Sequence, residues 1–152
     1  MIRPMRPIDC NRIEMIEAEK FTTTLDCRWL LSMLGKPNFC GFVDDLDHMT
    51  DLAGYLIATI AADEAEILSI AVTANHQRLG CGNGLLTHFL AYADKKNIKT
   101  VMLEVAADNG AALALYCRHG FKQFGQRTNY YKRRAGYCDA IMMKCSPDEA
   151  FP

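Results

Sequence analysis

The stretch HQRLGCGNGLL, residues 76–86, places three glycines within five positions: Gly80, Gly82 and Gly84. It follows the apolar run EILSIAV and precedes LLTHFLAYADKK, whose apolar residues recur at helical spacing. Glycine loses more conformational entropy on folding than any other residue, so such a strand-to-helix turn needs a compensating interaction. Because bare backbone amides at a helix start attract negative charge, the turn predicts an anion held against residues 78–83.

Two familiar phosphate-binding loops do not fit this turn. The nucleoside-triphosphate loop needs a Lys-Ser/Thr pair after its last glycine, where this chain has two leucines. The dinucleotide fingerprint would place its third glycine on Leu85 or Thr87. The pattern that remains is Gln77-x-x-Gly80-x-Gly82, which either cradles a pyrophosphate or only lets the helix pack tightly.

Length and composition fit one soluble globular domain. The chain has 152 residues, of which 50% are apolar and 23% are charged, and its formal net charge is −1. No general attraction to nucleic acid or to a membrane surface is therefore indicated, and no apolar stretch is long enough to cross a bilayer. Because the amino terminus lacks the apolar core of a secretory signal, we expect a cytoplasmic protein.

The seven cysteines show none of the close spacings of zinc or redox motifs. We therefore expect small buried thiols in a reducing compartment, with no metal and no structural disulfide.

The periodicity predicts a mixed α/β protein. A strand around residues 2–5 precedes helices at about 9–20, with Asp9 as N-cap, and 27–34. Strands follow at 39–45, 51–61 and 65–73, then a helix at 82–96, a strand at 99–107 and a helix at 109–120. The last strands, 121–128 and 138–145, flank a basic, tyrosine-rich connection. This order predicts a mostly antiparallel sheet with one central β-α-β crossover, in a single domain over residues 1–145 with a flexible tail at 146–152.

Glu104 interrupts the apolar strand VMLEV. An unpaired buried charge is costly, so this carboxylate should be partnered, face a wet cleft or stay protonated. Such a group is a candidate general base, and a strand-end acid paired with a surface lysine is the alternative. Side chains alternate along a strand, so Glu104 should share a face with Met102 and oppose Leu103 and Val105.

Asn109 and Tyr116 lie two helical turns apart on one predicted face. From there the phenol of Tyr116 could reach a ligand that is anchored near Asn109. The alternative is that Tyr116 is a core aromatic and Asn109 a simple helix cap.

Several segments together resemble the GNAT acetyltransferase superfamily, which binds acetyl-CoA. The pyrophosphate-binding signature of that superfamily is similar to Gln77-x-x-Gly80-x-Gly82. AEILSIAV, HQRLGCGNGLL, LEVAADNGAALALYCRHGF and RTNYYKRRAGYCDAIMM follow the order and spacing of one branch, the bacterial ribosomal-protein-alanine N-acetyltransferases. The resemblance spans about residues 64–143. It implies the GNAT fold: about six to seven strands, mostly antiparallel, with about four flanking helices and a splay between the fourth and fifth strands.

The resemblance also implies roles for individual residues. Glu104 becomes the base toward the incoming amine, and Tyr116 becomes the acid that protonates the departing CoA thiolate, without a covalent enzyme intermediate. Tyr130 and Tyr131 are implied to contact the acceptor, whereas Cys117 is expected only to pack. The implied cofactor-binding residues are Ile70, Ala71, Val72, Gln77, Arg78, Leu79, Gly80, Cys81, Gly82, Asn83 and Asn109.

The chain departs from the pattern of this branch in two places. The usual Pro-Trp-Ser segment is replaced by TTTLDCRWLL, residues 22–31, with Trp29 displaced, and Cys138 stands where an acidic residue is usual. A basic cluster on the late connection is either a solvated hairpin or a surface for a ribosomal or acidic partner. The cluster is Arg127, Lys132, Arg133 and Arg134.

The sequence thus predicts an acetyl-CoA-dependent N-acetyltransferase that acts on the N-terminal amine of a protein or peptide. The resemblance implies that this acceptor is a ribosomal protein. The same chemistry on a small amine, and a non-catalytic acyl-CoA-binding module, remain open alternatives. We expect a monomer or weak homodimer.

Overall fold

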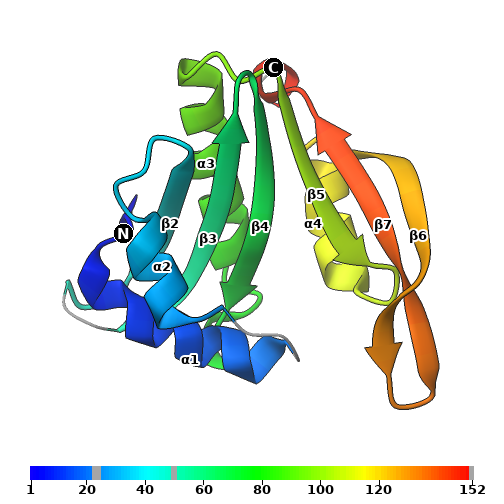
Figure 1. Cartoon of the computed structure of the whole chain (residues 1–152), viewed down its shortest axis with the longest axis horizontal. Helices are drawn as coiled ribbons and strands as arrows, with labels where there is room; N and C mark the ends of the chain where they lie inside the picture. The colour runs from blue at the N-terminus through cyan, green and yellow to red at the C-terminus, as the bar shows by residue number, and fades with distance from the viewer. Residues whose placement is uncertain (22–24, 49–50, 151–152) are drawn as a thin grey trace.

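The computed structural model describes residues 1–21, 25–48 and 51–150, and its centre is a seven-stranded sheet (Figure 1). The strands are β1 Ile2–Pro4, β2 Phe39–Asp45, β3 Leu52–Ala61, β4 Glu64–Val72, β5 Thr100–Ala106, β6 Lys122–Arg133 and β7 Gly136–Cys145. Their order in the sheet is β1-β2-β3-β4-β5-β7-β6. Neighbours are antiparallel except β4 and β5, which are parallel, so the predicted mixed, mostly antiparallel sheet is confirmed.

Four α-helices cover the two faces of the sheet in the described part of the chain (Figure 1). On one face lie α1 Cys10–Lys20 and α2 Cys27–Met33, and on the other lie α3 Cys81–Lys95 and α4 Gly110–Arg118. Each face has its own apolar core. Ile13, Ile16 and Leu30 pack with Tyr55 and Ile57 under α1 and α2. Leu85, Phe89 and Leu90 pack with Leu56, Ile67 and Leu103 under α3.

The helix α3 makes the predicted crossover between the parallel strands, and its apolar stripe explains its position. Leu85, Leu86, Phe89, Leu90 and Ala93 recur at helical spacing, and all are buried. The stripe therefore fixes α3 against the sheet, with its first turn beside the end of β4.

The two halves of the sheet part between β4 and β5. These strands pair only from Glu64 opposite Thr100 to Ile67 opposite Leu103, and beyond that point they diverge (Figure 1). The splay implied by the resemblance is therefore present, between the fourth and fifth strands.

A β-bulge in β4 lies where the strands part. Ala58 faces Ile67 and Ile57 faces Ser69 across the ladder, so Leu68 is an extra residue. One extra residue reverses the faces of everything that follows, because side chains alternate along a strand. Ala65 and Ile67 thus belong to the core under α3, whereas Ala71 belongs to the core under α1.

The basic, tyrosine-rich segment is wrongly predicted as a connection, because it continues the β6–β7 hairpin. Arg133 still pairs with Gly136, so only residues 134 and 135 form the tip. From Arg127 to Tyr131, β6 advances by four residues, whereas its partner β7 advances by only two, from Ala140 to Cys138. This irregularity breaks the period-two pattern on which strand prediction depends.

Other differences from the sequence prediction are local. Asp9 precedes α1 but does not cap it, because its carboxylate accepts two hydrogen bonds from the Arg3 guanidinium, at 2.8 and 2.9 Å, and one from the Arg6 amide. Helix α3 begins one residue earlier than predicted and α2 ends one residue earlier. After β7, residues 147–149 form a short 3-10 helix in which Pro147 is buried.

The cysteines follow the predicted burial in part. Cys10, Cys40, Cys81 and Cys145 are buried, Cys27 and Cys138 are half-buried, and all seven are free thiols. Cys117 is exposed on α4, so the expectation that it packs is wrong. Its neighbour Tyr116 takes the inward face of the helix, which leaves the next residue toward solvent.

Candidate active site

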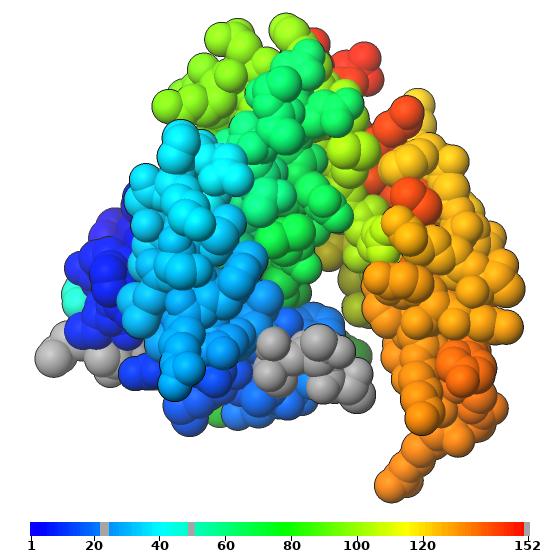
Figure 2. Space-filling model, viewed as in Figure 1, coloured from blue at the N-terminus to red at the C-terminus, as the bar shows by residue number. Residues whose placement is uncertain are grey.

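A cleft of about 640 Å³ opens where β4 and β5 part, and Figure 2 shows the hollow between the body of the molecule and the β6–β7 hairpin. One wall is β4 from Ile67 to Val72, and the other is β5 from Leu103 to Ala106. Side chains at the end of α1, along α4 and on β6 complete the lining.

The edge of β4 that faces the cleft is free. No described strand pairs with it beyond Ile67, so backbone groups of residues 68–72 are available to a ligand. An extended ligand can hydrogen-bond such an edge as an added strand would. The sequence-predicted residues Ile70, Ala71 and Val72 all lie here and line the cleft.

The glycine-rich turn lies at the end of this edge. Gly80 has φ +89° and Arg78 has φ +61°, both left-handed, and the helix α3 starts at Cys81. Among the described residues, no backbone acceptor is paired with the amides of residues 78–83. Left-handed residues before a helix start make a concave group of N–H donors, to which the helix dipole adds positive potential. The turn therefore offers a group of N–H donors of the kind that binds anions in other proteins.

The predicted anion-site residues differ in what they offer. Gln77 donates its side-chain amide to the Val72 carbonyl at 3.5 Å, which joins the turn to β4. Leu79 is 74% exposed, whereas Cys81 is buried and offers only its amide. Asn83 contacts His119 at the end of α4, with Oδ1 and Nε2 2.8 Å apart. Gly82 lines the cleft, and a Cβ added there would lie 3.5 Å from a Leu115 methyl group and 3.7 Å from a Val72 methyl group.

Tyr116 reaches the cleft from α4. The residue is 5% exposed, and its hydroxyl forms no hydrogen bond with any described residue. Buried tyrosines usually find a partner for the hydroxyl, so this one is left for a ligand. Burial raises the pKa of Tyr116 to about 12, with a smaller contribution from Tyr131, and the phenol keeps its proton at neutral pH.

Glu104 lies on β5 just past the last residue that pairs with β4. Buried and half-buried residues alternate along β5, so Glu104 is on the face opposite Leu103 and Val105, as predicted. Its Oε1 lies 2.8 Å from Nε of Arg127 on β6. The ion-pair partner of Glu104 is therefore an arginine two strands away in the sheet, and the Glu104 carboxylate still lines the cleft.

Asn109 and the two hairpin tyrosines occupy different positions. Asn109 caps α4, because its Oδ1 accepts a hydrogen bond from the Ala112 amide at 3.2 Å, and it also lines the cleft. Tyr131 lines the cleft, but Tyr130 does not; its ring lies under the Arg127 guanidinium, outside the lining. The structure thus brings Tyr131, and not Tyr130, together with the other predicted site residues.

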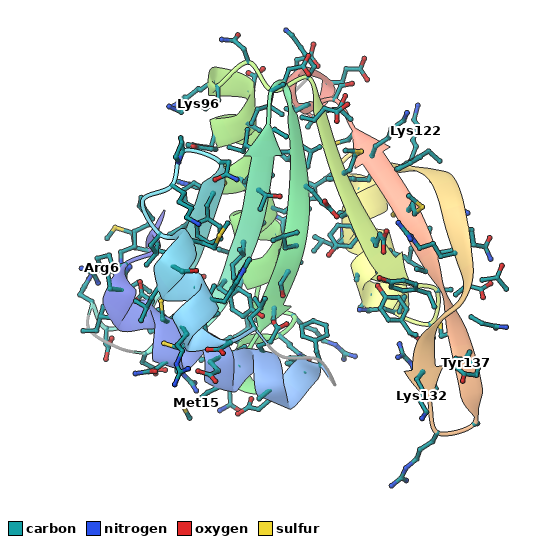
Figure 3. The ribbon with its side chains drawn as sticks, in the orientation of Figure 1. Arg6, Met15, Lys96, Lys122, Lys132 and Tyr137 are labelled. Carbon is teal, nitrogen blue, oxygen red and sulfur yellow. The ribbon has the colours of Figure 1, made fainter. Side chains whose placement is uncertain are left out.

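The basic cluster is partly neutralised. Arg127 pairs with Glu104, and Arg133 makes two hydrogen bonds to Asp108. Lys132 lies near the far end of the hairpin in Figure 3. The half-buried Trp29, from the altered segment, packs edge-on against Phe39 outside the cleft, whereas residues 22–24 of that segment lie outside the described residues.

Glu17 is a cleft residue that the sequence reasoning missed. It lies on α1, where Ile13 and Ile16 suggested only a core-facing stripe, and it is 5% exposed. The sequence did contain a signal for it: Glu17 directly follows the apolar Ile16, so its carboxylate lies at the edge of the core-facing stripe. Within the described ranges, no helix could span a membrane, and no three His, Cys, Asp or Glu side chains are grouped as a metal site.

Comparison with known proteins agrees with this geometry. The family model described as "Acetyltransferase (GNAT) family" matches residues 8–121, which is more than half of the chain. The chain belongs to the GNAT acetyltransferase family. The GNAT fold is also found in the crystal structure of the ribosomal-protein-S18-alanine N-acetyltransferase from Escherichia coli, which superposes with a TM-score of 0.87 at 31% identity, over 96% of this chain and 92% of that one.

Curated GNAT relatives are similar over a shorter stretch. The [ribosomal protein bS18]-alanine N-acetyltransferase of Escherichia coli (strain K12) is 41% identical over 92 residues, 60% of this chain and 62% of the relative. The protein of the same name from Haemophilus influenzae (strain ATCC 51907 / DSM 11121 / KW20 / Rd) is 34% identical over 95 residues, 62% of this chain and 64% of the relative. These matches therefore span less than two thirds of either relative.

Proposed function

We propose that this GNAT protein is an acetyl-CoA-dependent N-acetyltransferase whose acceptor is the N-terminal amine of a protein. The observation that carries the proposal is the meeting of three features in one cleft: a free β4 edge that ends at an anion-binding turn, the Glu104 carboxylate and the unpartnered Tyr116 phenol.

The residues present fit acetyl-CoA. The amides of residues 78–83 would hold the pyrophosphate, because they are free and lie at a helix start. The free edge of β4 would hold the pantetheine arm by backbone hydrogen bonds. When bound, the coenzyme supplies an activated acetyl thioester.

The side chains across the cleft would then manage protons. Glu104 would accept the proton that the attacking amine loses, directly or through a water molecule. Tyr116 would donate its hydroxyl hydrogen to the departing sulfur, since its raised pKa of about 12 keeps it protonated throughout the neutral range. Backbone amides of β4 would polarise the carbonyl that is attacked.

The proposed acceptor is a protein with N-terminal alanine, a ribosomal protein in the cytoplasm being the first candidate. Two arguments support this choice. The relatives of similar sequence are named for alanine acetylation of ribosomal protein bS18. The cleft is also lined by the aromatic side chains of Phe21, just after α1, and of Tyr131 on the hairpin, against which an extended peptide would pack.

Exchanging the proposed acid and base tests the chemistry. We expect Glu104→Gln and Tyr116→Phe each to lower kcat about 10²–10⁴-fold for an alanine peptide, because positioned acid–base groups contribute on that order. Coenzyme release is followed by thiol detection, and acetyl-CoA affinity is measured by calorimetry. The matched control is Tyr137→Phe, since Tyr137 is 64% exposed near the hairpin end (Figure 3).

The results separate the alternatives. Near-normal turnover in both variants would remove the acid–base assignment. Tight acetyl-CoA binding with no thiol release across peptides and free amines would favour a non-catalytic module, and faster turnover of free amines than of peptides would favour a small-molecule acceptor.

A further inference from the structure

Glu17 is buried at the cleft with one oxygen of its carboxylate left free. The Tyr55 hydroxyl donates to Oε2, and the Ser69 hydroxyl donates to the same oxygen at 2.9 Å. Among the described residues, Oε1 has no hydrogen-bond partner. Glu17 is 5% exposed and lines the cleft, so a ligand in the cleft would meet this carboxylate.

Glu17 is also the cleft carboxylate without a counter-charge. Three carboxylates line the cleft in the described part of the chain: Glu17, Glu104 and Asp108. Glu104 is paired with Arg127, and Asp108 is paired with Arg133. Glu17 makes no ion pair with any described residue. A buried, unpaired carboxylate is costly, and burial raises the pKa of Glu17 while the Ser69 hydrogen bond opposes that rise.

The position of Glu17 relates it to the acceptor rather than to the coenzyme. Ser69, which holds it, directly precedes Ile70, the first of the three β4 residues expected along the pantetheine arm. The bulge at Leu68 turns Ser69 to the α1 face of the sheet, whereas the anion-binding turn belongs to α3 on the opposite face. Glu17 thus lies on the α1 side of the cleft, on the face of the sheet opposite to the proposed coenzyme turn.

We propose that Oε1 of Glu17 binds the N-terminal ammonium group of the acceptor peptide, with Tyr55 and Ser69 holding the carboxylate in place. This inference rests on the proposed function and adds the residue that selects a charged, unblocked N-terminus. An ammonium supplies the donor and the positive charge that Glu17 lacks.

A thermodynamic cycle tests this contact. The Kd of a peptide beginning with alanine is compared with that of the same peptide carrying an N-terminal propionyl group, which lacks only the amine. Calorimetry is done on the complex with CoA, for the wild type and Glu17→Gln. We expect the wild type to prefer the ammonium peptide by roughly tenfold to a hundredfold, and Glu17→Gln to lose that preference.

The control variant is Glu19→Gln, because Glu19 is two residues along α1 but exposed and outside the cleft lining. It should keep the wild-type preference. A preference that survives in Glu17→Gln, or that is absent from the wild type, overturns the inference. If the alanine peptide binds with this preference but is never acetylated, the proposed function fails and the ammonium site stands.

A second measurement uses only the wild type, in case Glu17→Gln does not fold. The preference of the wild type for the alanine peptide over the propionyl peptide should fall as the pH is lowered from about 7 to about 4.5. At the lower pH the Glu17 carboxyl becomes neutral, whereas an α-amine of pKa about 8 stays charged. The other ionisable groups lining the cleft are Lys20, Glu104, Asp108, Tyr116, Tyr131 and Arg133. Among the described residues, only Tyr55 and Ser69 form hydrogen bonds with the Glu17 carboxylate. A preference that does not change over this range contradicts the inference.

Discussion

Gly80 is the residue on which the geometry of the proposed anion-binding turn depends. Its φ of +89° is left-handed, and a Cβ added there would meet no atom within 4 Å. The obstacle to any other residue is therefore backbone strain rather than crowding. The left-handed Arg78, two residues earlier, tolerates similar strain, which shows that the turn is held by its surroundings.

Gly80→Ala is therefore expected to destabilise the protein by about 1 kcal/mol and to weaken coenzyme A binding about tenfold, because relaxing the strain moves the amides of the turn. Urea unfolding and calorimetry measure the two effects. Gly110→Ala is the matched control: it starts α4, its φ is not left-handed, and its Cβ would also meet nothing within 4 Å. Equal coenzyme affinity in both variants would exclude a role for the turn geometry.

At the scale of elements, two irregular strands shape the cleft. The bulge at Leu68 turns Ser69 toward α1, where it meets Glu17. The irregularity between Arg127 and Tyr131 in β6 is held by Asp139, whose Oδ1 accepts a hydrogen bond from the Asn129 amide at 2.8 Å and whose Oδ2 accepts one from Gln126. Asp139 itself lies outside the cleft lining, so it acts on the site through the strand.

Asp139→Ala should therefore raise the KM for an alanine peptide several-fold and leave acetyl-CoA affinity unchanged, because Tyr131 would lose its fixed place in the cleft. The loss of stability should be about 1 kcal/mol, as two exposed hydrogen bonds are removed. Steady-state kinetics and urea unfolding give the two values, with Lys132→Ala on the same hairpin as control. An unchanged peptide KM would show that the bend in β6 does not position Tyr131.

At the scale of the whole molecule, the proposed coenzyme site has two parts, the free edge of β4 and the turn before α3. They lie together because β3, β4 and α3 approach closely. A Cβ at Gly54 would lie 2.6 Å from the Ala71 carbonyl oxygen and 3.0 Å from the Cys81 sulfur. Ala71 belongs to the free edge and Cys81 starts α3, so Gly54 sets the spacing between the two parts of the proposed coenzyme site.

Gly54→Ala is thus expected to cost roughly 1–3 kcal/mol of stability, as overpacking does, and to weaken coenzyme A binding as well. Gly125→Ala is the control, because its Cβ would meet the Met142 sulfur at 3.2 Å, where the far end of a flexible side chain can move. Unfolding and calorimetry on both variants test the prediction. Normal coenzyme affinity in a destabilised Gly54→Ala would mean that the spacing does not control the site.

The sequence by itself determined much of the local structure. The apolar stripe of α3 and the alternation of β5 predicted the crossover and the face of Glu104, because both depend on periods set by local backbone geometry. The motif predicts Gly80 at the site, the family resemblance implies Tyr116 and Asn109 there, and all three lie at the cleft or at the turn that ends it.

The tertiary structure alone decided which side chains meet across the cleft. The partner of Glu104 is Arg127 from β6 and not the surface lysine of the alternative interpretation, and Glu17 meets Ser69 only because a bulge shifts the faces of β4 by one residue. Such contacts join residues far apart in the chain, and no local period records them. The sequence therefore determined which elements form, and the pairing of strands, with its irregularities, determined the chemistry that they bring together.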